Sequence, residues 1–251
     1  MLNSFKSYIK RKIVRKKIVP IVIKDIESNL LVGKKAFITG GSSGIGFAIA
    51  KKFIASGCEV IIGGSDESKL KKCAEELNCK FLTADLNDIP NLKEQIINHL
   101  GVVDILVNSA GYHGVEKFGE ITPYEWDKVM NINLRGMYFI CQFVSKVMIK
   151  HGTKGHILNV SSASALKPGW TPYEISKRAV NGLTLGFADK LIRYGIVVNG
   201  IAPGPTATPM LGKVVDGDLD LEWNANPSGR MSTVEEIANL ALFMVSDLGN
   251  G

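Results

Sequence analysis

The chain has few cysteines, and their spacing is not that of a metal site. Only four occur among 251 residues, and Cys58, Cys73, Cys79 and Cys141 form no pair of the kind that binds zinc. We therefore expect no metal, and we interpret the thiols as small buried side chains in a reducing compartment.

Long hydrophobic runs are also lacking. No apolar stretch reaches the length of a transmembrane helix, and no secretory leader with a cleavage site is visible. These absences favour a cytoplasmic protein. No repeat or linker divides the chain after its first residues, so we expect one large α/β domain.

Acidic residues are missing from positions 1–24, which hold eight lysines and arginines. The whole chain carries a net charge of +6, so the remaining residues are slightly acidic overall. Apolar residues interleave with these charges as far as Pro20, a pattern compatible with an amphipathic helix on an anionic membrane surface. A solvated extension is the simpler alternative. Because no basic patch continues into the body, we expect no nucleic-acid binding. We divide the chain into a basic extension, 1–30, and a domain, 31–251.

From residue 33 onward, strand-like and helix-like segments alternate. This alternation predicts a doubly wound, Rossmann-like parallel sheet with helices on both faces. We expect strands over 36–39, 59–63, 80–84, 105–108, 155–160 and 196–202, and helices over 67–77, 90–100, 124–151 and 172–194.

A glycine-rich turn follows the first expected strand. Gly40, Gly44 and Gly46 lie between that strand and apolar residues at helical spacing. Absent side chains let backbone approach a pyrophosphate, and a helix N-terminus offers N–H groups to its charge. The glycine spacing differs from the standard dinucleotide fingerprint. A tight turn without a ligand is the simpler alternative.

Polar and small residues follow four of the strands. They are Asp85, the run 108–111, the pair Ser161 and Ser162, and the run 203–208. Since ligands bind beyond the carboxyl ends of parallel strands, these residues predict one shared crevice.

A tyrosine and a lysine lie four residues apart on the last expected helix. Tyrosine alone titrates near ~10, too high for acid–base work at neutral pH, and a positive Lys177 one turn away would stabilise the anion of Tyr173. The pair and the glycine turn together supply the parts needed to move a hydride and a proton.

These motifs together resemble the short-chain dehydrogenase/reductase family, in its compact single-domain branch, from about Gly33 to the end of the chain. The resemblance implies a nicotinamide dinucleotide and an alcohol or carbonyl substrate. It implies catalytic roles for Asn133, Ser162, Tyr173 and Lys177, with Ser161 as the alternative serine. It implies that the cofactor contacts Gly40, Ser42, Ser43, Gly44, Ile45, Gly46, Asp85, Leu86, Asn108, Ala110, Gly111, Tyr173, Lys177, Pro203, Gly204, Thr206 and Thr208.

Three features depart from the family's pattern. Ser162 and Tyr173 are closer together than is usual. The position of the acid that selects NAD holds Gly64, and Asp66 is displaced from it, which favours NADP while leaving NAD open. The chain stops before the last strand of the sheet, so we expect an unpaired edge.

We expect a neutral or weakly polar alcohol or ketone as substrate, in a pocket lined by Tyr112, His113, Trp170 and residues 210–223. We also expect a homo-oligomer. The alternative function is a non-catalytic NAD(P)-binding scaffold or redox sensor. A sugar-nucleotide epimerase or dehydratase of the longer related branch is excluded by the glycine spacing and the length of the chain.

Overall fold

The computed structural model of the chain describes residues 29–114, 117–211, 214–215, 218–219, 221, 226 and 228–249. The basic extension and most of residues 212–225 therefore lie outside the described residues. The expected amphipathic helix, the membrane contact and the boundary at residue 30 stay predictions. Leu31 is already part of the body, because it is buried and its backbone N–H donates to Ser56.

Six parallel strands form the central sheet, in the order β3-β2-β1-β4-β5-β6. Each strand is a short run of mostly apolar residues, as expected where helices cover both faces. The strands are β1 (Lys35–Thr39), β2 (Glu59–Gly64), β3 (Lys80–Thr83), β4 (Ile105–Asn108), β5 (His156–Val160) and β6 (Val197–Ile201).

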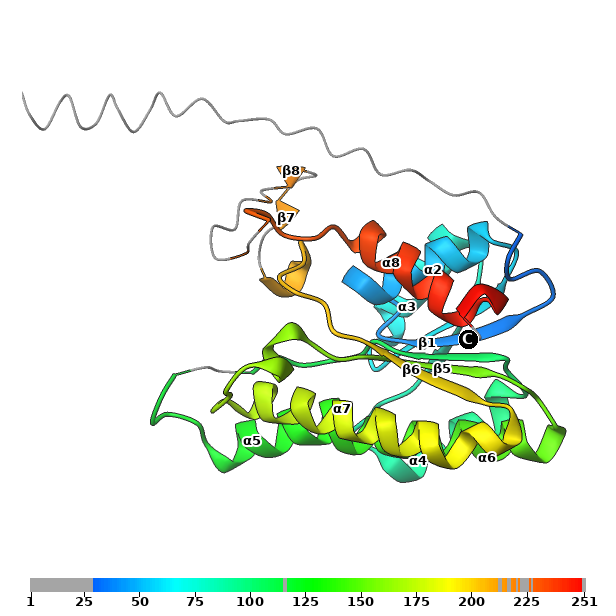
Figure 1. Ribbon diagram of the computed structural model, residues 1–251, viewed down its shortest axis with the longest axis horizontal. Helices are drawn as coiled ribbons and strands as arrows, with labels where there is room; N and C mark the ends of the chain where they lie inside the picture. The colour runs from blue at the N-terminus through cyan, green and yellow to red at the C-terminus, as the bar shows by residue number, and fades with distance from the viewer. Residues whose placement is uncertain are drawn as a thin grey trace, which may run out of the picture.

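Helices cover both faces of this sheet, so the predicted doubly wound fold is confirmed (Figure 1). One face packs against α2 (Gly44–Ala55), α3 (Glu67–Leu77) and α8 (Val234–Val245). The other packs against α4 (Ile89–Gln95), η1 (Ile96–Leu100), α6 (Met137–His151) and α7 (Pro172–Leu191). The remaining elements are α5 (Pro123–Met130), η2 (Asn131–Gly136), η3 (Ala163–Leu166), η4 (Ile192–Tyr194), η5 (Pro209–Leu211), β7 (Val214–Val215), β8 (Asp218–Leu219) and η6 (Asp247–Gly249).

Two predicted helices contain an irregular turn. The helix expected over 124–151 is α5 and α6 joined by η2, a π-helical stretch, and the helix expected over 90–100 ends in the π-helical η1. Such turns are frequent at functional sites, and η2 holds Asn133. The hydrophobic period that predicted these helices does not reveal a local change in their hydrogen bonding.

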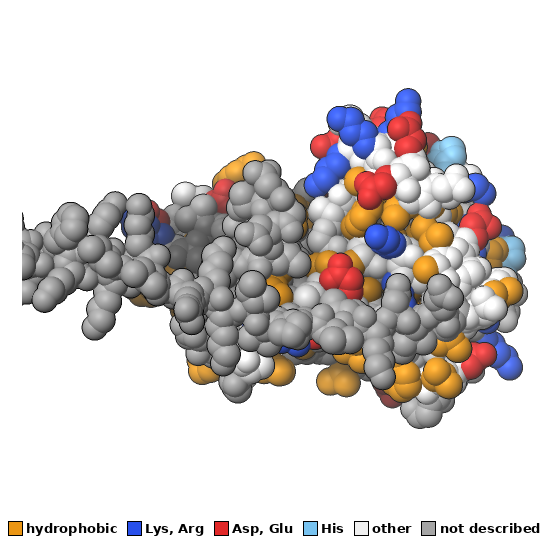
Figure 2. Space-filling view, turned by 90° about the horizontal axis from the view of Figure 1, so that it is seen from above, with side chains coloured by type: hydrophobic (Ala, Val, Ile, Leu, Met, Phe, Trp, Pro, Cys, Tyr) orange, Lys and Arg blue, Asp and Glu red, His pale blue; other side chains and the backbone are white. Residues whose placement is uncertain are grey.

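The β6 strand forms one edge of the sheet, and no strand follows α8 among the residues described. The helix α8 nevertheless packs closely against α2, so the face above the β1 strand is covered. Acidic and basic side chains are interspersed over the described part of the face seen in Figure 2.

No helix in the described ranges has both the length and the apolar character needed to cross a membrane. All four cysteines carry free thiols. Burial raises the pKa of Cys58 and of Cys141 to about 12, which fits their expected role as small core residues.

Candidate active site

A crevice opens at the carboxyl ends of β1, β4, β5 and β6. The chain passes from β1 to β2 and β3 on one side and then to β4 on the other, so β1 and β4 flank the point where strand order reverses. Ligands of doubly wound sheets bind at this point. The crevice is a cavity of about 440 Å³, lined by residues from the ends of all four strands and from α7.

The glycine turn lies at one wall of this cavity and leaves no room for side chains. A Cβ on Gly46 would lie 2.3 Å from the carbonyl oxygen of Gly40, and one on Gly40 would lie 2.7 Å from the backbone of Ala110. Gly40 and Gly44 also have positive φ angles, +66° and +52°, which favour glycine. The turn is therefore a backbone surface held directly against the start of the next loop.

The helix α2 begins in this turn with its backbone donors available. Its N-cap residue, Ser43, makes no side-chain hydrogen bond to the helix, so the side chain does not satisfy the first N–H groups. Ser43, Gly44 and Ile45 line the cavity. A close-packed glycine turn leading into an uncapped helix fits a pyrophosphate, and these residues would hold that part of a dinucleotide.

Thr208 lies over the glycine turn from the opposite wall. A Cβ on Gly44 would lie 3.3 Å from the Cγ2 atom of Thr208. Pro203, Gly204, Thr206 and Thr208 all line the cavity, as the sequence predicts for the loop after β6. The structure thus brings the first and last strand ends together over one ligand-sized space.

Some of the predicted cofactor residues do not line this cavity. Ser42 and Gly46 belong to the glycine turn but are not among the residues that line the cavity, and Asp85 accepts two hydrogen bonds from Asn87 in its own loop. Leu86 is buried, and its Cβ packs against Gly136. The contacts of these four residues with the cofactor stay predictions.

The side chain of Asn108 is taken up by a buried polar cluster. Its Nδ2 atom donates to Asn159 at 2.8 Å and to the Sγ of Cys141 at 3.1 Å. Asn108 is therefore linked to β5 and α6, and only its neighbours Ser109, Ala110 and Gly111 line the cavity.

Tyr173 and Lys177 both line the crevice from the first turns of α7. A capping box of Thr171 and Glu174 fixes the start of this helix. The Lys177 ammonium lies 5.8 Å from the ring centre of Tyr173 and donates to the Val160 carbonyl at 2.8 Å. Burial lowers the pKa of Lys177 to about 8, so the group is still largely charged at neutral pH.

Asn133 joins the loop after β4 to α7. Its Oδ1 accepts from the Tyr112 N–H at 2.7 Å, and its Nδ2 donates to the Tyr112 carbonyl and to the Ser176 hydroxyl. Both amide protons are thereby used, and one lone pair on Oδ1 remains. A Cβ on Gly111 would lie 3.6 Å from both Asn133 and Lys177, so the two side chains converge beneath this loop.

The structure separates the two candidate serines. The Ser161 hydroxyl is buried, within hydrogen-bond distance of Lys177 O and Asn181 Oδ1 on α7. Ser162 is half-buried in the cavity wall, and its Oγ lies 2.6 Å from that of Ser164. This arrangement favours Ser162 as the serine that meets a substrate.

Other residues of the site were missed or placed differently by the sequence. Ser164 was missed, and only its position two residues after Ser162 hints at it. The Glu174 carboxylate was missed, although Thr171 three residues earlier gives the pattern of a capping box. Tyr112 does not line the cavity, since its ring lies under the Lys128 ammonium at 4.2 Å.

His113 lines the cavity as predicted and contacts the catalytic candidate. Its ring centre lies 4.5 Å from that of Tyr173. Of the segment 210–223, Met210 and Leu211 line the cavity, and most of the rest lies outside the described residues. No three His, Cys, Asp or Glu side chains come together as a metal site in the described part of the chain.

The family model for short chain dehydrogenases matches residues 34–218. The chain belongs to this family. The short-chain dehydrogenases are NAD(P)-dependent oxidoreductases, and the protein accordingly transfers a hydride between a nicotinamide dinucleotide and an alcohol or carbonyl compound. The predicted family, enzyme class and hydride chemistry are confirmed.

Several curated members of this family are similar over most of their length. The chain is 35% identical to a 3alpha-hydroxysteroid dehydrogenase of Mediterraneibacter gnavus, over 88% of this chain and 93% of the relative. It is 37% identical to a 3-oxoacyl-[acyl-carrier-protein] reductase of Chlamydia muridarum, with the same coverage. It is 33% identical to a gluconate 5-dehydrogenase of Gluconobacter oxydans, over 86% and 89%.

Solved structures agree with this assignment. A 3-oxoacyl-[acyl-carrier protein] reductase from Brucella melitensis with bound NAD superimposes with a TM-score of 0.80 at 26% identity, covering 93% of this chain and 92% of the other. The relatives are named for dehydrogenase and reductase activities, and none of these comparisons favours the non-catalytic scaffold.

Proposed function

We propose that Tyr173 is the general acid and base of this short-chain dehydrogenase. In carbonyl reduction it gives its hydroxyl proton to the substrate oxygen, and in alcohol oxidation it takes that proton back. A nicotinamide dinucleotide, when bound, supplies or accepts the hydride. The observation that carries the proposal is the buried Lys177 ammonium 5.8 Å from the Tyr173 ring, in the wall that faces the glycine turn.

The neighbouring side chains support this role. The Lys177 ammonium can donate three hydrogen bonds, and one of them goes to the Val160 carbonyl. The other two donors remain for the phenolate of Tyr173 and for groups in the crevice. The hydroxyl of Ser162 polarises the substrate oxygen. Asn133 is a positioning residue, because it holds the backbone of Tyr112 on both sides and bonds to Ser176 on α7.

The substitution Tyr173→Phe tests the acid–base role. We expect kcat for carbonyl reduction to fall by about 10²–10⁴-fold, the usual contribution of a general acid. The dissociation constant for NADPH should change little, because only a hydroxyl is lost. Tyr194→Phe, beyond the far end of α7, is the matched control. Retained turnover in Tyr173→Phe would refute the assignment, and cofactor binding without turnover in the native enzyme would favour the scaffold.

We propose NADP as the preferred cofactor. No carboxylate stands at Gly64, and that of Asp66 caps α3 by accepting from the Lys69 N–H at 3.0 Å and the Ser68 hydroxyl at 2.9 Å. These hydrogen bonds lower the pKa of Asp66 and hold it at the helix, away from the position that selects NAD.

Cofactor choice can be tested at Gly64 itself. A Cβ there would make only ordinary contacts, 3.6 Å from Leu70, so Gly64→Asp fits the fold. We expect the native enzyme to bind NADPH more tightly than NADH. Gly64→Asp should change the ratio of the two dissociation constants by at least about tenfold in favour of NADH. A native enzyme that prefers NADH would contradict this proposal.

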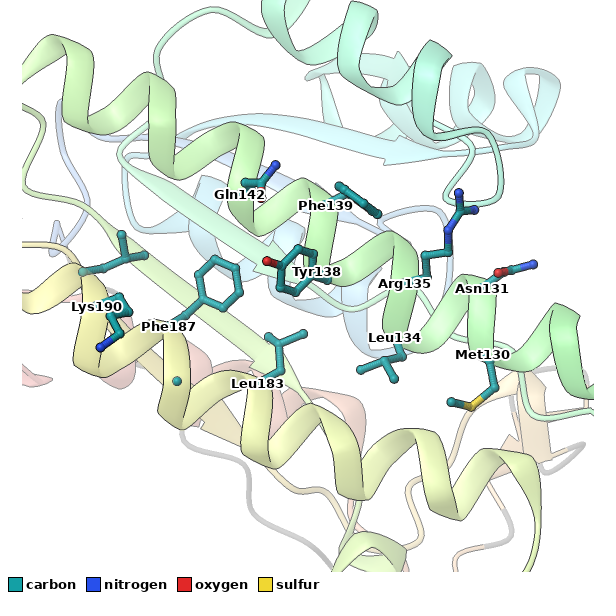
Figure 3. Close-up of a pocket in the computed structure, with 12 residues that line it drawn as sticks. Met130, Asn131, Leu134, Arg135, Tyr138, Phe139, Gln142, Leu183, Phe187 and Lys190 are labelled. Atoms are coloured by element: carbon teal, nitrogen blue, oxygen red, sulfur yellow. The ribbon is translucent and has the colours of Figure 1, made fainter.

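We further propose that the short-chain dehydrogenase forms a homo-oligomer through the outer face of α6 and α7. A groove of about 760 Å³ lies between these helices and is mostly apolar, with the rings of Tyr138 and Phe187 in contact at 5.5 Å (Figure 3). Gly186 has no side chain to fill its side of the groove, and a Cβ built there would have no atom within 4 Å. A second copy offers the same apolar surface and can cover the first in a two-fold pair.

The mass in solution tests this interface. We expect at least a dimer at micromolar concentration, and dissociation in Phe187→Arg with the fold retained by circular dichroism. Leu240→Arg, an exposed position on α8, is the matched control. A native monomer would exclude the interface.

A further inference from the structure

The mouth of the crevice is bordered by large apolar side chains from three separate loops. Phe118 belongs to the loop after β4, Leu166 and Trp170 to the segment between β5 and α7, and Met210 to the turn after β6. Their exposed fractions are 84%, 72%, 47% and 54%. We call these four residues the apolar rim.

The rim is continuous with the cavity that holds Tyr173. Met210 lines that cavity directly, and Leu166 ends the η3 turn, whose Ala163 and Ser164 also line it. Trp170 is attached through Glu174, a cavity residue whose carboxylate accepts from the backbone N–H of Trp170 at 2.9 Å. Phe118 meets Trp170 edge to face at 5.4 Å, so two of the loops contact one another at the rim.

Two charged side chains, Lys167 and Glu174, line the cavity close to the rim. The Glu174 carboxylate also accepts from the Thr171 N–H and hydroxyl, so three donors of its own helix start engage it. The four exposed side chains of the rim are themselves apolar, so a substrate with an apolar body would remove exposed hydrocarbon from water there.

The volume of the cavity decides where a large substrate would lie. The cavity of about 440 Å³ must hold the nicotinamide end of the cofactor as well as the reacting carbon of the substrate. A large substrate therefore extends outward to the rim. Resting on the function proposed above, we propose that the substrates are ketones or secondary alcohols with a large apolar body, which lies against Phe118, Trp170 and Met210.

A series of methyl ketones tests the proposal. We would measure kcat/KM with NADPH for 2-butanone, 2-hexanone, 2-octanone and 2-decanone, which share one reacting group. Burial of each added methylene should raise kcat/KM by about twofold to fourfold until the rim is filled. We therefore expect kcat/KM for 2-decanone to exceed that for 2-butanone by at least about 30-fold. We also expect little turnover of the polyol gluconate with NADP.

Rim variants locate the effect. In Trp170→Ala and Met210→Ala the ratio of kcat/KM for 2-decanone to kcat/KM for 2-butanone should fall at least about fivefold, because less apolar surface remains to cover the alkyl chain of the ketone. Tyr194→Ala, an exposed aromatic at the opposite end of α7, should leave the ratio unchanged. A ratio near one in the native enzyme, or an equal ratio in the rim variants, would overturn the proposal.

The outcomes separate this inference from the proposed function. If the enzyme reduces short and long ketones equally well, Tyr173 keeps its role and only the rim assignment fails. If it reduces no carbonyl compound, the proposed function fails first. If Trp170→Ala lowers the molecular mass without changing the ratio, the rim is a contact between copies of the chain, and the substrate proposal is rejected.

Discussion

The two walls of the crevice are built on opposite principles. The wall formed by β1 and α2 works through missing side chains, since Gly40 and Gly46 allow backbone to lie where a Cβ would collide. The wall formed by α7, supported from behind by Asn133 of η2, works through buried polar side chains, since Asn133 and Lys177 each bond to backbone carbonyls inside the fold. The first wall is thus sensitive to any added atom, and the second to any lost donor.

Adding one methyl group to the first wall should have the largest effect. In Gly46→Ala the new Cβ meets a backbone oxygen at 2.3 Å, which cannot rotate away. We expect a loss of at least about 3 kcal/mol in the free energy of unfolding and no measurable NADPH binding. Gly182→Ala is the matched control, because nothing lies within 4 Å and alanine favours the helix. Unchanged binding in Gly46→Ala would break the comparison.

Removing a side chain from the second wall should have the next largest effect. Asn133→Ala leaves the Tyr112 N–H and carbonyl without their buried partner, and we expect a cost of about 2–4 kcal/mol in unfolding free energy. Asn131→Ala, two residues earlier and at the edge of the outer groove, should cost less than about 1 kcal/mol. Chemical denaturation measures both. Equal costs would show that the hydrogen bonds of Asn133 do not stabilise this wall.

The buried ammonium should reveal itself through pH. The folded pKa of Lys177 is about 8, below the ordinary value of 10.5, so the unfolded chain binds more protons between these values and stability rises with pH in that window. The buried thiols Cys58 and Cys141, with pKa values raised to about 12, act in the opposite direction above about pH 9.

Comparison with Lys177→Met isolates the contribution of the lysine. Between pH 7 and 10 the native enzyme should gain about 2–3 kcal/mol of unfolding free energy relative to this variant, measured without cofactor. The same comparison between the native enzyme and Lys150→Met, a substitution at an exposed position, is the control and should give no such gain. A difference that is independent of pH would show that burial does not lower the pKa of Lys177.

A substitution that belongs to neither wall should have the smallest effect. Lys80 and Glu59 form an exposed ion pair at 2.9 Å, with 73% and 52% of their side chains accessible. We expect Lys80→Ala to change the free energy of unfolding by less than about 0.5 kcal/mol and to leave NADPH binding intact. A larger loss would show that position alone does not decide the sensitivity of a residue.

The sequence predicted the first wall better than the second. A run of glycines between a strand and a helix predicts a tight turn whether or not a ligand binds there, and the short apolar runs predicted the bounds of the six strands to within about one residue. The partners of Asn133 and Asn108 could not be predicted in this way. Asn133 is hydrogen-bonded to Tyr112, 21 positions away, and Asn108 to Asn159, 51 positions away. A local hydrophobic period contains no information on such distant pairs.

The rim was predicted only in part. Trp170 and the segment that begins at Met210 were expected to line the substrate pocket, and of these two residues Met210 lines the cavity and Trp170 does not. Phe118 was missed, because its contact with Trp170 joins two loops that carry no secondary-structure signal. The two-residue strands β7 and β8 and the helix α8 were also outside the prediction.

The capping box at the start of α7 lies between the loop that borders the substrate and the helix residues proposed to transfer the proton. Thr171 and Glu174 anchor the first turn of the helix by bonds among residues 170–174, so the start of the helix that carries Tyr173 and Lys177 is fixed by its own residues. Residues 165–169 can therefore be exchanged to admit a new molecule while the first turn of the helix stays fixed, provided that Ser164 is kept for its contact with Ser162 and that the Lys167 carbonyl keeps its bond from Arg178. A designer seeking altered selectivity would begin with that loop and leave the helix untouched.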